Sequence, residues 1–193
     1  GNHENCLQDW EKFASLSLLE GDSGFTINCG LKMHGNGSLT SDEKKSFRVH
    51  FRGKYGDSTL DYDLFDDCVS VFDSLVIRAG EDYRYSIFKN DVATAYAYKY
   101  LPSLNSQTGK YCSLYINGEY FGIYYLQERL TELSVSEHYD VDEDGVIIEE
   151  FAPDKSSELY KIMEFAKNND LTVTANYEYI TNKIDIESMT DWI

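Results

Sequence analysis

The first half of the chain alternates between apolar and polar residues with a period of two, which predicts β-strands. Phe13–Leu19 and Gly24–Leu31 form one such pair around a turn at residues 20–22. Ser46–Arg52 alternates most regularly, so its apolar side chains should face a core and its arginine and histidine side chains the opposite side. The short apolar run Ser74–Arg78 is typical of an interior strand.

Farther along the chain, the pattern changes. Apolar residues recur at helical spacing over Ile87–Leu101, which predicts a helix ended by Pro102. Two alternating runs, Cys112–Ile116 and Glu119–Leu126, then flank the dipeptide Asn117-Gly118. Because Asn-Gly suits the two positive-φ positions of a type I′ turn, this segment predicts a β-hairpin.

The last third of the chain is expected to be mainly helical. Glu128–His138 and Ser157–Lys167 have helical patterns, and Ala175–Ile193 has room for two short helices, the last beginning near Asp185. Val146–Glu150 predicts one further strand. The predicted fold class is therefore α+β: an antiparallel, β-rich N-terminal lobe carrying the Asn-Gly hairpin, with packed helices late in the chain.

Length and composition fit one domain. The 193 residues are 42% hydrophobic and contain no Ser/Gly/Pro-rich linker, so we expect a single unit over residues 1–193. Its β-rich portion should cover about residues 10–150 and its helical portion about residues 155–193. The first residue is not methionine, and residues 191–193 lie inside a helical pattern, so we expect a C-terminally truncated domain of a longer protein.

Charge narrows the range of partners. The chain carries 17 Lys and Arg against 34 Asp and Glu, a formal net charge of −17, which argues against nucleic acid and anionic membrane as partners. No apolar run approaches the ~18 residues needed to cross a bilayer, so no membrane span is expected. The 16 tyrosines suit half-buried sheet faces and wet binding clefts, because each ring carries a polar tip.

Neither the cysteines nor the acidic residues form a recognisable metal-binding pattern. The four cysteines lie far apart, without zinc spacing, and fit free core thiols as well as one or two disulfides: Cys6, Cys29, Cys68 and Cys112. Asp140–Gly145 resembles the start of a calcium loop, but Phe151 stands where that pattern requires Glu. A solvated acidic turn fits this segment better, and no metal site is predicted.

Five short segments carry a resemblance to a known family. The most specific is Leu114–Tyr124, followed by Glu128-Arg129. The others are His34–Ser38, Lys44–Val49, Leu75–Gly80 and Lys89–Asp91. The five segments occur in the family's order along the chain, over roughly residues 30 to 150, and resemble the CotH (spore-coat protein H-like) family of atypical protein kinases. His34 departs from the family pattern, which often has an arginine there.

The resemblance implies a β-rich lobe and a helical lobe around a nucleotide cleft, as in protein kinases. It implies ATP and Mg²⁺ as cofactors and a protein as phosphate acceptor in the full-length protein. The family's Asn/Asp-rich metal-binding segment would follow residue 193, so we expect this chain alone to be inactive and to bind neither cofactor tightly. Family members occur in spore coats, on bacterial surfaces and beside cellulosomal modules. The implied location is secreted or at the cell surface, with coat or surface proteins as partners.

Lys45 and Glu128 form the first pair of candidate site residues. Lys45 matches the family's lysine before Ser-aromatic, which implies contact with nucleotide phosphates; a solvated lysine at a strand start is the alternative. Glu128 ends the hairpin and is expected to begin the next helix, where it could pair with Lys45 as a catalytic carboxylate. Otherwise Glu128 would only stabilise the dipole of that helix.

Arg78 and Asp91 form the second pair. Arg78 ends an interior strand and could bind a phosphate of the cofactor in bidentate fashion, while Asp91 is a candidate catalytic carboxylate. A structural Arg78–Asp91 ion pair explains both residues equally well. The loop Gly35–Ser38 could bring backbone N–H groups against a phosphate or be only a tight turn.

Two classes of function follow from these observations. The first is a kinase-like domain of a secreted or surface protein that transfers phosphate from a nucleotide to protein. The second is a noncatalytic surface or scaffold module that binds glycan or protein through a tyrosine-rich face.

Overall fold

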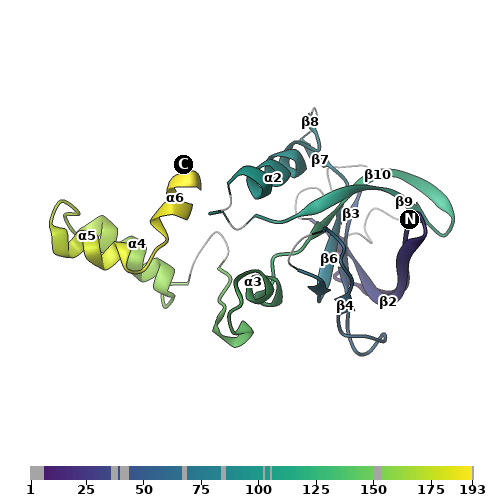
Figure 1. The fold of residues 1–193 in the computed structure, drawn as a ribbon, viewed down its shortest axis with the longest axis horizontal. Helices are drawn as coiled ribbons and strands as arrows, with labels where there is room; N and C mark the ends of the chain where they lie inside the picture. Colours follow the sequence, from purple (N-terminus) through teal and green to yellow (C-terminus); the bar gives the residue numbers. More distant parts are fainter. Residues whose placement is uncertain are drawn as a thin grey trace. The chain divides into compact units, whose positions relative to one another are not determined.

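The structure is a computed structural model that describes residues 7–35, 39, 44–66, 69–83, 86–101, 103–104, 106–149 and 154–192. Contacts within the chain divide it into two compact units, residues 1–96 with 106–146 and residues 97–105 with 147–193. The first unit holds the strands, and the second is mainly helical (Figure 1).

A curled, six-stranded antiparallel sheet forms the body of the first unit, with the strand order β1-β2-β3-β6-β10-β9. Its strands are β1 (Glu11–Glu20), β2 (Ser23–His34), β3 (Ser46–His50), β6 (Ser74–Arg78), β10 (Glu119–Glu128) and β9 (Gly109–Ile116). The predicted α+β class, with its antiparallel sheet, is confirmed. The position of β6 between β3 and β10 also makes it the interior strand that its apolar sequence predicted.

The hydrophobic core lies on one face of this sheet. Val49 of β3 pairs with both Leu31 of β2 and Leu75 of β6, so alternation brings their side chains to the same side. Residues 51–72, which include the two short strands β4 (Leu60–Asp61) and β5 (Val71–Phe72), contribute further core side chains. The buried core consists of Cys29, Val49, Phe51, Leu60, Leu64, Val69, Phe72, Leu75, Ile77, Ala79, Tyr124 and Leu126.

The β9–β10 hairpin has the predicted two-residue turn. Ile116 pairs directly with Glu119, and the two residues between them have positive φ, 52° at Asn117 and 83° at Gly118. Both angles are those of a type I′ turn, whose twist matches that of the flanking strands. The Asn-Gly prediction is confirmed.

Among the described elements, three helical segments and a small two-stranded sheet accompany the large sheet. They are β7 (Glu81–Tyr83), β8 (Ser86–Ile87), α2 (Lys89–Tyr100), α3 (Glu132–Tyr139) and the 3₁₀ turn η2 (Glu143–Gly145). The predicted helix around residues 87–101 is present as α2, but the residue that it buries is Asp91. Val92 and Tyr96, which contributed to the apolar spacing, are 57% and 61% exposed.

Two local predictions are wrong. Glu128 does not begin a helix, because β10 continues to this residue and pairs it with Leu75 of β6. The helix begins at Glu132 instead, after the N-cap Thr131. Residues 146–149 of the predicted strand Val146–Glu150 are not in a strand, and Glu150 lies outside the described residues. An alternating sequence needs a neighbouring strand to complete its hydrogen bonds, and the topology gives this segment none among the described strands.

The helical unit matches its prediction closely. It contains α4 (Glu158–Asn168), α5 (Thr174–Thr181) and α6 (Ile186–Trp192). Ser157 caps α4 by accepting a hydrogen bond from the backbone N–H of Tyr160, and the rings of Phe165 and Tyr179 pack α4 against α5 with centroids 4.1 Å apart. In the part of the chain that is described, no helix is long and apolar enough to span a membrane.

Two of the cysteines are described, and both are free thiols. Cys29 is buried and Cys112 is half-buried. Burial raises the pKa of the Cys29 thiol to about 11, so it stays protonated at neutral pH. Cys6 and Cys68 lie outside the described residues, so the question of disulfides involving them stays open.

Candidate functional site

Arginine side chains gather on the face of the sheet opposite the core. Arg48 of β3 and Arg78 of β6 alternate with core residues along their strands and therefore point away from the core. Arg129 directly follows β10, and its Nη1 donates to Oγ of Ser74, a β6 residue on the same face, at 3.3 Å. Three of the five arginines of an acidic chain thus share one face. The name arginine face is used below for Arg48, Arg78 and Arg129 together with His34 and His50.

The two histidines of the arginine face are held in the neutral form. Burial, and then Arg48, Arg78 and Arg129, together lower the pKa of His34 to about 4. Nδ1 of the neutral His34 ring therefore accepts a hydrogen bond from Nη2 of Arg48 at 3.2 Å. Burial, followed by nearby arginines, also lowers the pKa of His50 to about 4. The positive charge of this face at neutral pH therefore comes from guanidinium groups, which suit bidentate binding of phosphate.

Arg78 and Asp91 form the ion pair that the sequence allowed. Nε of Arg78 donates to Oδ1 of Asp91, whose side chain is fully buried. Gly80, at φ 76°, turns the chain after β6, and the ring of Phe88 packs where a side chain on Gly80 would lie. The N–H of Phe88 also donates to the carbonyl of Gly80 at 2.8 Å. This turn brings the first residues of α2 back to the end of β6.

A buried hydroxyl group lies next to this ion pair. Tyr125 of β10 pairs in register with Arg78 and shares its face of the sheet. The residue is 1% exposed, and its hydroxyl has no hydrogen-bond partner among the described residues. Burial, and then Tyr111 and Asp91, raise the pKa of Tyr125 to about 12, so the hydroxyl stays protonated and remains a donor. A buried donor without a partner is costly to a fold and is often retained for a ligand.

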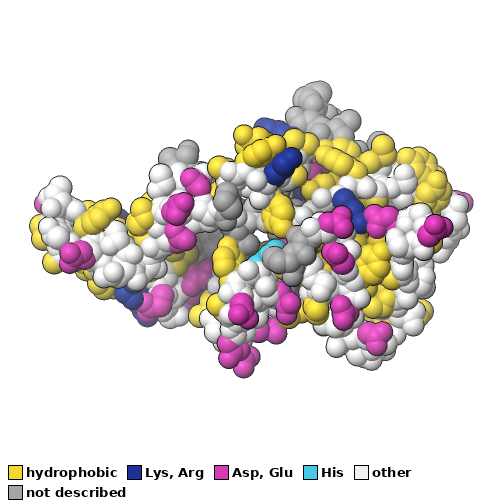
Figure 2. Space-filling view, in the orientation of Figure 1, with side chains coloured by type: hydrophobic (Ala, Val, Ile, Leu, Met, Phe, Trp, Pro, Cys, Tyr) yellow, Lys and Arg dark blue, Asp and Glu magenta, His cyan; other side chains and the backbone are white. Residues whose placement is uncertain are grey.

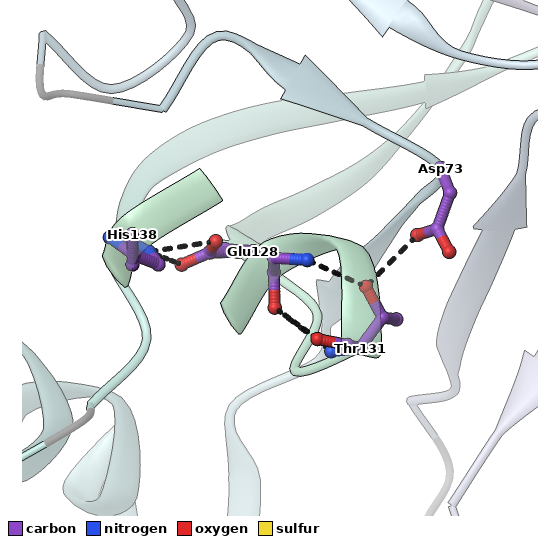
Figure 3. Close-up of polar contacts among 5 residues, drawn as sticks. Asp73, Glu128, Thr131 and His138 are labelled. Atoms are coloured by element: carbon purple, nitrogen blue, oxygen red, sulfur yellow. Dashed lines mark hydrogen bonds and ion pairs between the residues drawn. The ribbon is translucent and has the colours of Figure 1, made fainter. Parts of the chain in front are cut away.

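Glu128 is paired with a histidine. Nε2 of His138 lies 2.9 Å and 3.0 Å from the two carboxylate oxygens of Glu128, and both residues are shielded from solvent (Figure 3). His138 belongs to α3, whose capping box joins Thr131 and Ser134. The hydroxyl of Thr131 also lies 3.4 Å from a carboxylate oxygen of Asp73. These contacts fasten α3 to the end of β10 and to the residue that precedes β6.

Lys45 lies immediately before β3, and its Nζ donates to the carbonyl of Leu39 at 2.9 Å. Its neighbour Lys44 contacts both β10 and the residue after β6. Nζ of Lys44 donates to the carbonyls of Ala79, at 2.7 Å, and of Ile123, and lies 4.2 Å from the ring centroid of Tyr124. Two carbonyls and an aromatic face are favourable surroundings for a cation, so Lys44 joins the end of β6 to the middle of β10.

The predicted site residues are distributed over the sheet. The structure brings Arg78 and Asp91 together. Lys45 instead donates to the carbonyl of Leu39, and Glu128 is hydrogen-bonded to His138. In the register of the sheet, Glu128 of β10 lies level with Val49 of β3, and β6 lies between these two strands. Val49 is four residues after Lys45, so Lys45 and Glu128 are offset by ~13 Å along the strand direction. A joint role of Lys45 and Glu128 on a nucleotide stays a prediction.

A family model described as CotH kinase protein matches residues 31–193. The chain belongs to the CotH family. No curated protein and no solved structure matches the chain. The CotH match supports kinase-like function at the level of the family, and it confirms the resemblance carried by the sequence motifs. The matched residues include all of the arginine face and Asp91, while β1 lies before them.

Part of the arginine face was missed as a site in the sequence. Alternation in Ser46–Arg52 predicted that Arg48 and His50 would share a face, and this is confirmed. The sequence signal for Arg129 was its place in the CotH motif Glu128-Arg129. The signal for Tyr125 was strand alternation, which puts it on the same face as Gln127, two residues later. Neither signal indicates which other strand lies beside β10.

Acidic side chains are scattered over the face that Figure 2 draws. Even so, among the described residues no three His, Cys, Asp or Glu side chains come together as a metal site. Asp142, in the acidic segment, accepts a hydrogen bond from the N–H of Asp144 and caps η2.

Proposed function

We propose that this CotH chain binds the phosphates of ATP on its arginine face and serves a kinase-like transfer of phosphate to protein. The observation that carries the proposal is the convergence of Arg48, Arg78 and Arg129 around His34 in a chain of net charge −17. Guanidinium groups match the geometry of phosphate oxygens, and their gathering on one face gives an acidic chain a locally basic surface.

Neighbouring residues supply supporting roles. The buried Asp91 holds Arg78 in place, and the hydroxyl of Tyr125 beside Arg78 is a donor for a phosphate oxygen. Lys45 is retained in the proposal as a second phosphate ligand at the start of β3. Glu128 is retained as a candidate carboxylate, acting through its hydrogen-bonded His138.

The remaining parts of the proposal rest on the family. Mg²⁺ would be held by carboxylates outside the described residues, as the family resemblance implies. The acceptor would be a protein at the cell surface or in a spore coat, the setting with which the family is associated. Without the metal we expect ATP to bind only weakly, because the chain's net charge repels it.

The histidine reporter makes weak binding measurable. An anion bound among the arginines favours the protonated form of His34, so ATP at millimolar concentration should raise the pKa of this ring, followed by NMR. Adenosine, which lacks phosphates, should leave the ring unchanged. Arg48→Gln should abolish the ATP effect, whereas Arg52→Gln, at an exposed arginine paired with Glu11, should preserve it.

The result that would reject the proposal is equally specific. ATP that leaves the His34 resonances unmoved, or that moves them as much in Arg48→Gln as in the unaltered chain, would show that the arginines do not bind phosphate. In the full-length protein, transfer of labelled phosphate from ATP to protein should fall in Arg48→Gln and not in Arg52→Gln.

A second candidate function has one observation in its favour. Aromatic side chains are exposed along the β9–β10 hairpin: Tyr111, Tyr115, Tyr120 and Phe121 are 51%, 61%, 58% and 47% exposed. Such a surface suits a noncatalytic module that binds glycan or protein. Binding of short oligosaccharides that perturbs these rings, with no response of His34 to ATP, would favour this alternative.

A further inference from the structure

The curled sheet is open along a seam between its two edge strands. Among the described strands, β1 has only β2 as neighbour and β9 has only β10. The two edges nevertheless face one another, because Nζ of Lys110 in β9 lies 2.7 Å from Oε1 of Glu20 in β1. In Figure 1, β1 is the purple ribbon next to the N-terminus, and it lies near the β9–β10 hairpin.

A hollow of about 640 Å³ lies along this seam. Its lining includes six consecutive residues of β1, 15–20, and six consecutive residues of β9, 110–115. Successive residues of a strand point to opposite faces, so a hollow that touches all of them lies against the strand edges and not above one face. A second hollow of about 330 Å³ continues the seam to residues 13–16 of β1, residues 114–116 of β9 and Asn117 of the hairpin turn.

The floor of the seam is apolar, because it is the open part of the sheet's core face. Leu16, Leu18 and Phe25 line it from one side, and Leu114 and Leu126 from the other. The backbones of the two edge strands run along the seam. They are antiparallel to each other, because Lys110 contacts Glu20 at one end and residues 14 and 116 line the same hollow at the other. Edge strands offer unpaired N–H and C=O groups to another strand.

We infer that an extended segment of a partner protein, with apolar residues at every second position, enters this seam as an added strand between β1 and β9. Its backbone pairs with the edges, and its apolar side chains fill the hollow above Leu16 and Leu114. Its other face carries basic or polar residues, because the chain that it meets has a net charge of −17. The site involves β1, which precedes the CotH-matched residues, and it is independent of the proposed phosphate binding.

The probe is a nonapeptide of sequence Lys-Val-Thr-Val-Lys-Val-Thr-Val-Lys, which places all valines on one face. We expect it to bind the 193-residue chain and to slow hydrogen exchange at amides of both β1 and β9. The same peptide with N-methylated valines cannot pair with one edge and should bind at least about tenfold more weakly. Equal binding of the two peptides, protection of neither edge, or no binding at all would overturn the inference.

A matched pair of substitutions provides the second test. Leu18→Lys places a charge in the hollow and should weaken peptide binding at least about tenfold. Val92→Lys, at a side chain of α2 that is 57% exposed and does not line the hollow, should change it less than about twofold. If Leu18→Lys does not fold, the exchange measurement on the unaltered chain decides. Binding of laurate in the hollow without protection of β1 and β9 would identify a small-molecule cavity and also overturn the inference.

Discussion

His138 and Glu128 bind each other at the junction of β10 and α3, with the imidazole Nε2 within 3.0 Å of both carboxylate oxygens. Glu128 is 2% exposed, so removal of its carboxylate leaves a shielded imidazole without this partner. Glu128→Ala should lower the free energy of unfolding by about 2–3 kcal/mol in urea titrations.

The matched control for that substitution is Glu137→Ala, at an exposed carboxylate in the same helix. It should have little effect on stability. If Glu128→Ala is as stable as Glu137→Ala, the pair does not hold α3 to the sheet.

Asp91→Asn should also destabilise the chain, because the buried carboxylate is the partner of Arg78. Loss of one member of such a pair strands the other charge, which costs about 2–4 kcal/mol for a guanidinium that is partly exposed. Chemical unfolding monitored by tyrosine fluorescence would measure this change. The exposed Lys161–Glu158 pair supplies the comparison, and Glu158→Gln should have a much smaller effect. Equal effects would contradict a special role for the buried pair.

Gly118→Val should destabilise the β9–β10 hairpin by more than ~1 kcal/mol, because a β-branched residue is strained at a φ of 83°. No atom lies within 4 Å of the position that a new Cβ would take, so backbone strain is the expected cause. Gly53→Val, in an equally open turn without such a φ, is the control for thermal unfolding. A similar melting temperature for the two variants would argue against the turn assignment.

Acid should destabilise the fold through His34 and His50. Each has a pKa of about 4 in the folded chain against an ordinary value of 6.5, so between these values the unfolded state binds more protons. Stability is therefore full above pH 6.5, falls as the pH decreases toward 4, and levels off below it. Between pH 7 and 5 the loss should be about 1–2 kcal/mol for each ring, after allowance for partial exposure.

Urea unfolding at pH 7 and pH 5 tests this linkage, in a range above the ordinary titration of most carboxylates. The double variant His34→Gln with His50→Gln should show a much smaller difference between the two pH values. An unchanged pH dependence in the double variant would assign the effect to other groups.

The sequence predicted local structure better than it predicted neighbours. Alternation located β3 and its two faces, and the Asn-Gly dipeptide located the hairpin, because both signals lie within a few residues. The start of α3 was misplaced because the helical pattern extends backwards through Glu128, and the effective boundary is the cap at Thr131. The burial of Asp91 was not evident, since a helical period does not say which side meets the sheet.

The candidate site depended on the least predictable feature, the strand order. Arg48 and Arg129 come to the same face only because β6 enters between β3 and β10, which are far apart in the sequence. The ion pair between Arg78 and Asp91 was foreseen as one of two explanations, because both residues lie close in the chain on either side of one turn. The convergence of three arginines required knowledge of nonlocal pairing.

The central place of β6 also has a consequence for the folding rate. The β1–β2 and β9–β10 hairpins join neighbouring segments, whereas β6 pairs Ile77 with Phe47 and Arg78 with Tyr125 across long stretches of chain. Closure of such loops costs entropy before the contacts form, so we expect the two hairpins to form early and β6 to dock in the slow step. Changes at the hairpin tip should then mainly slow refolding, because the hairpin is already formed when β6 docks, whereas a conservative truncation such as Ile77→Val should both slow refolding and speed unfolding.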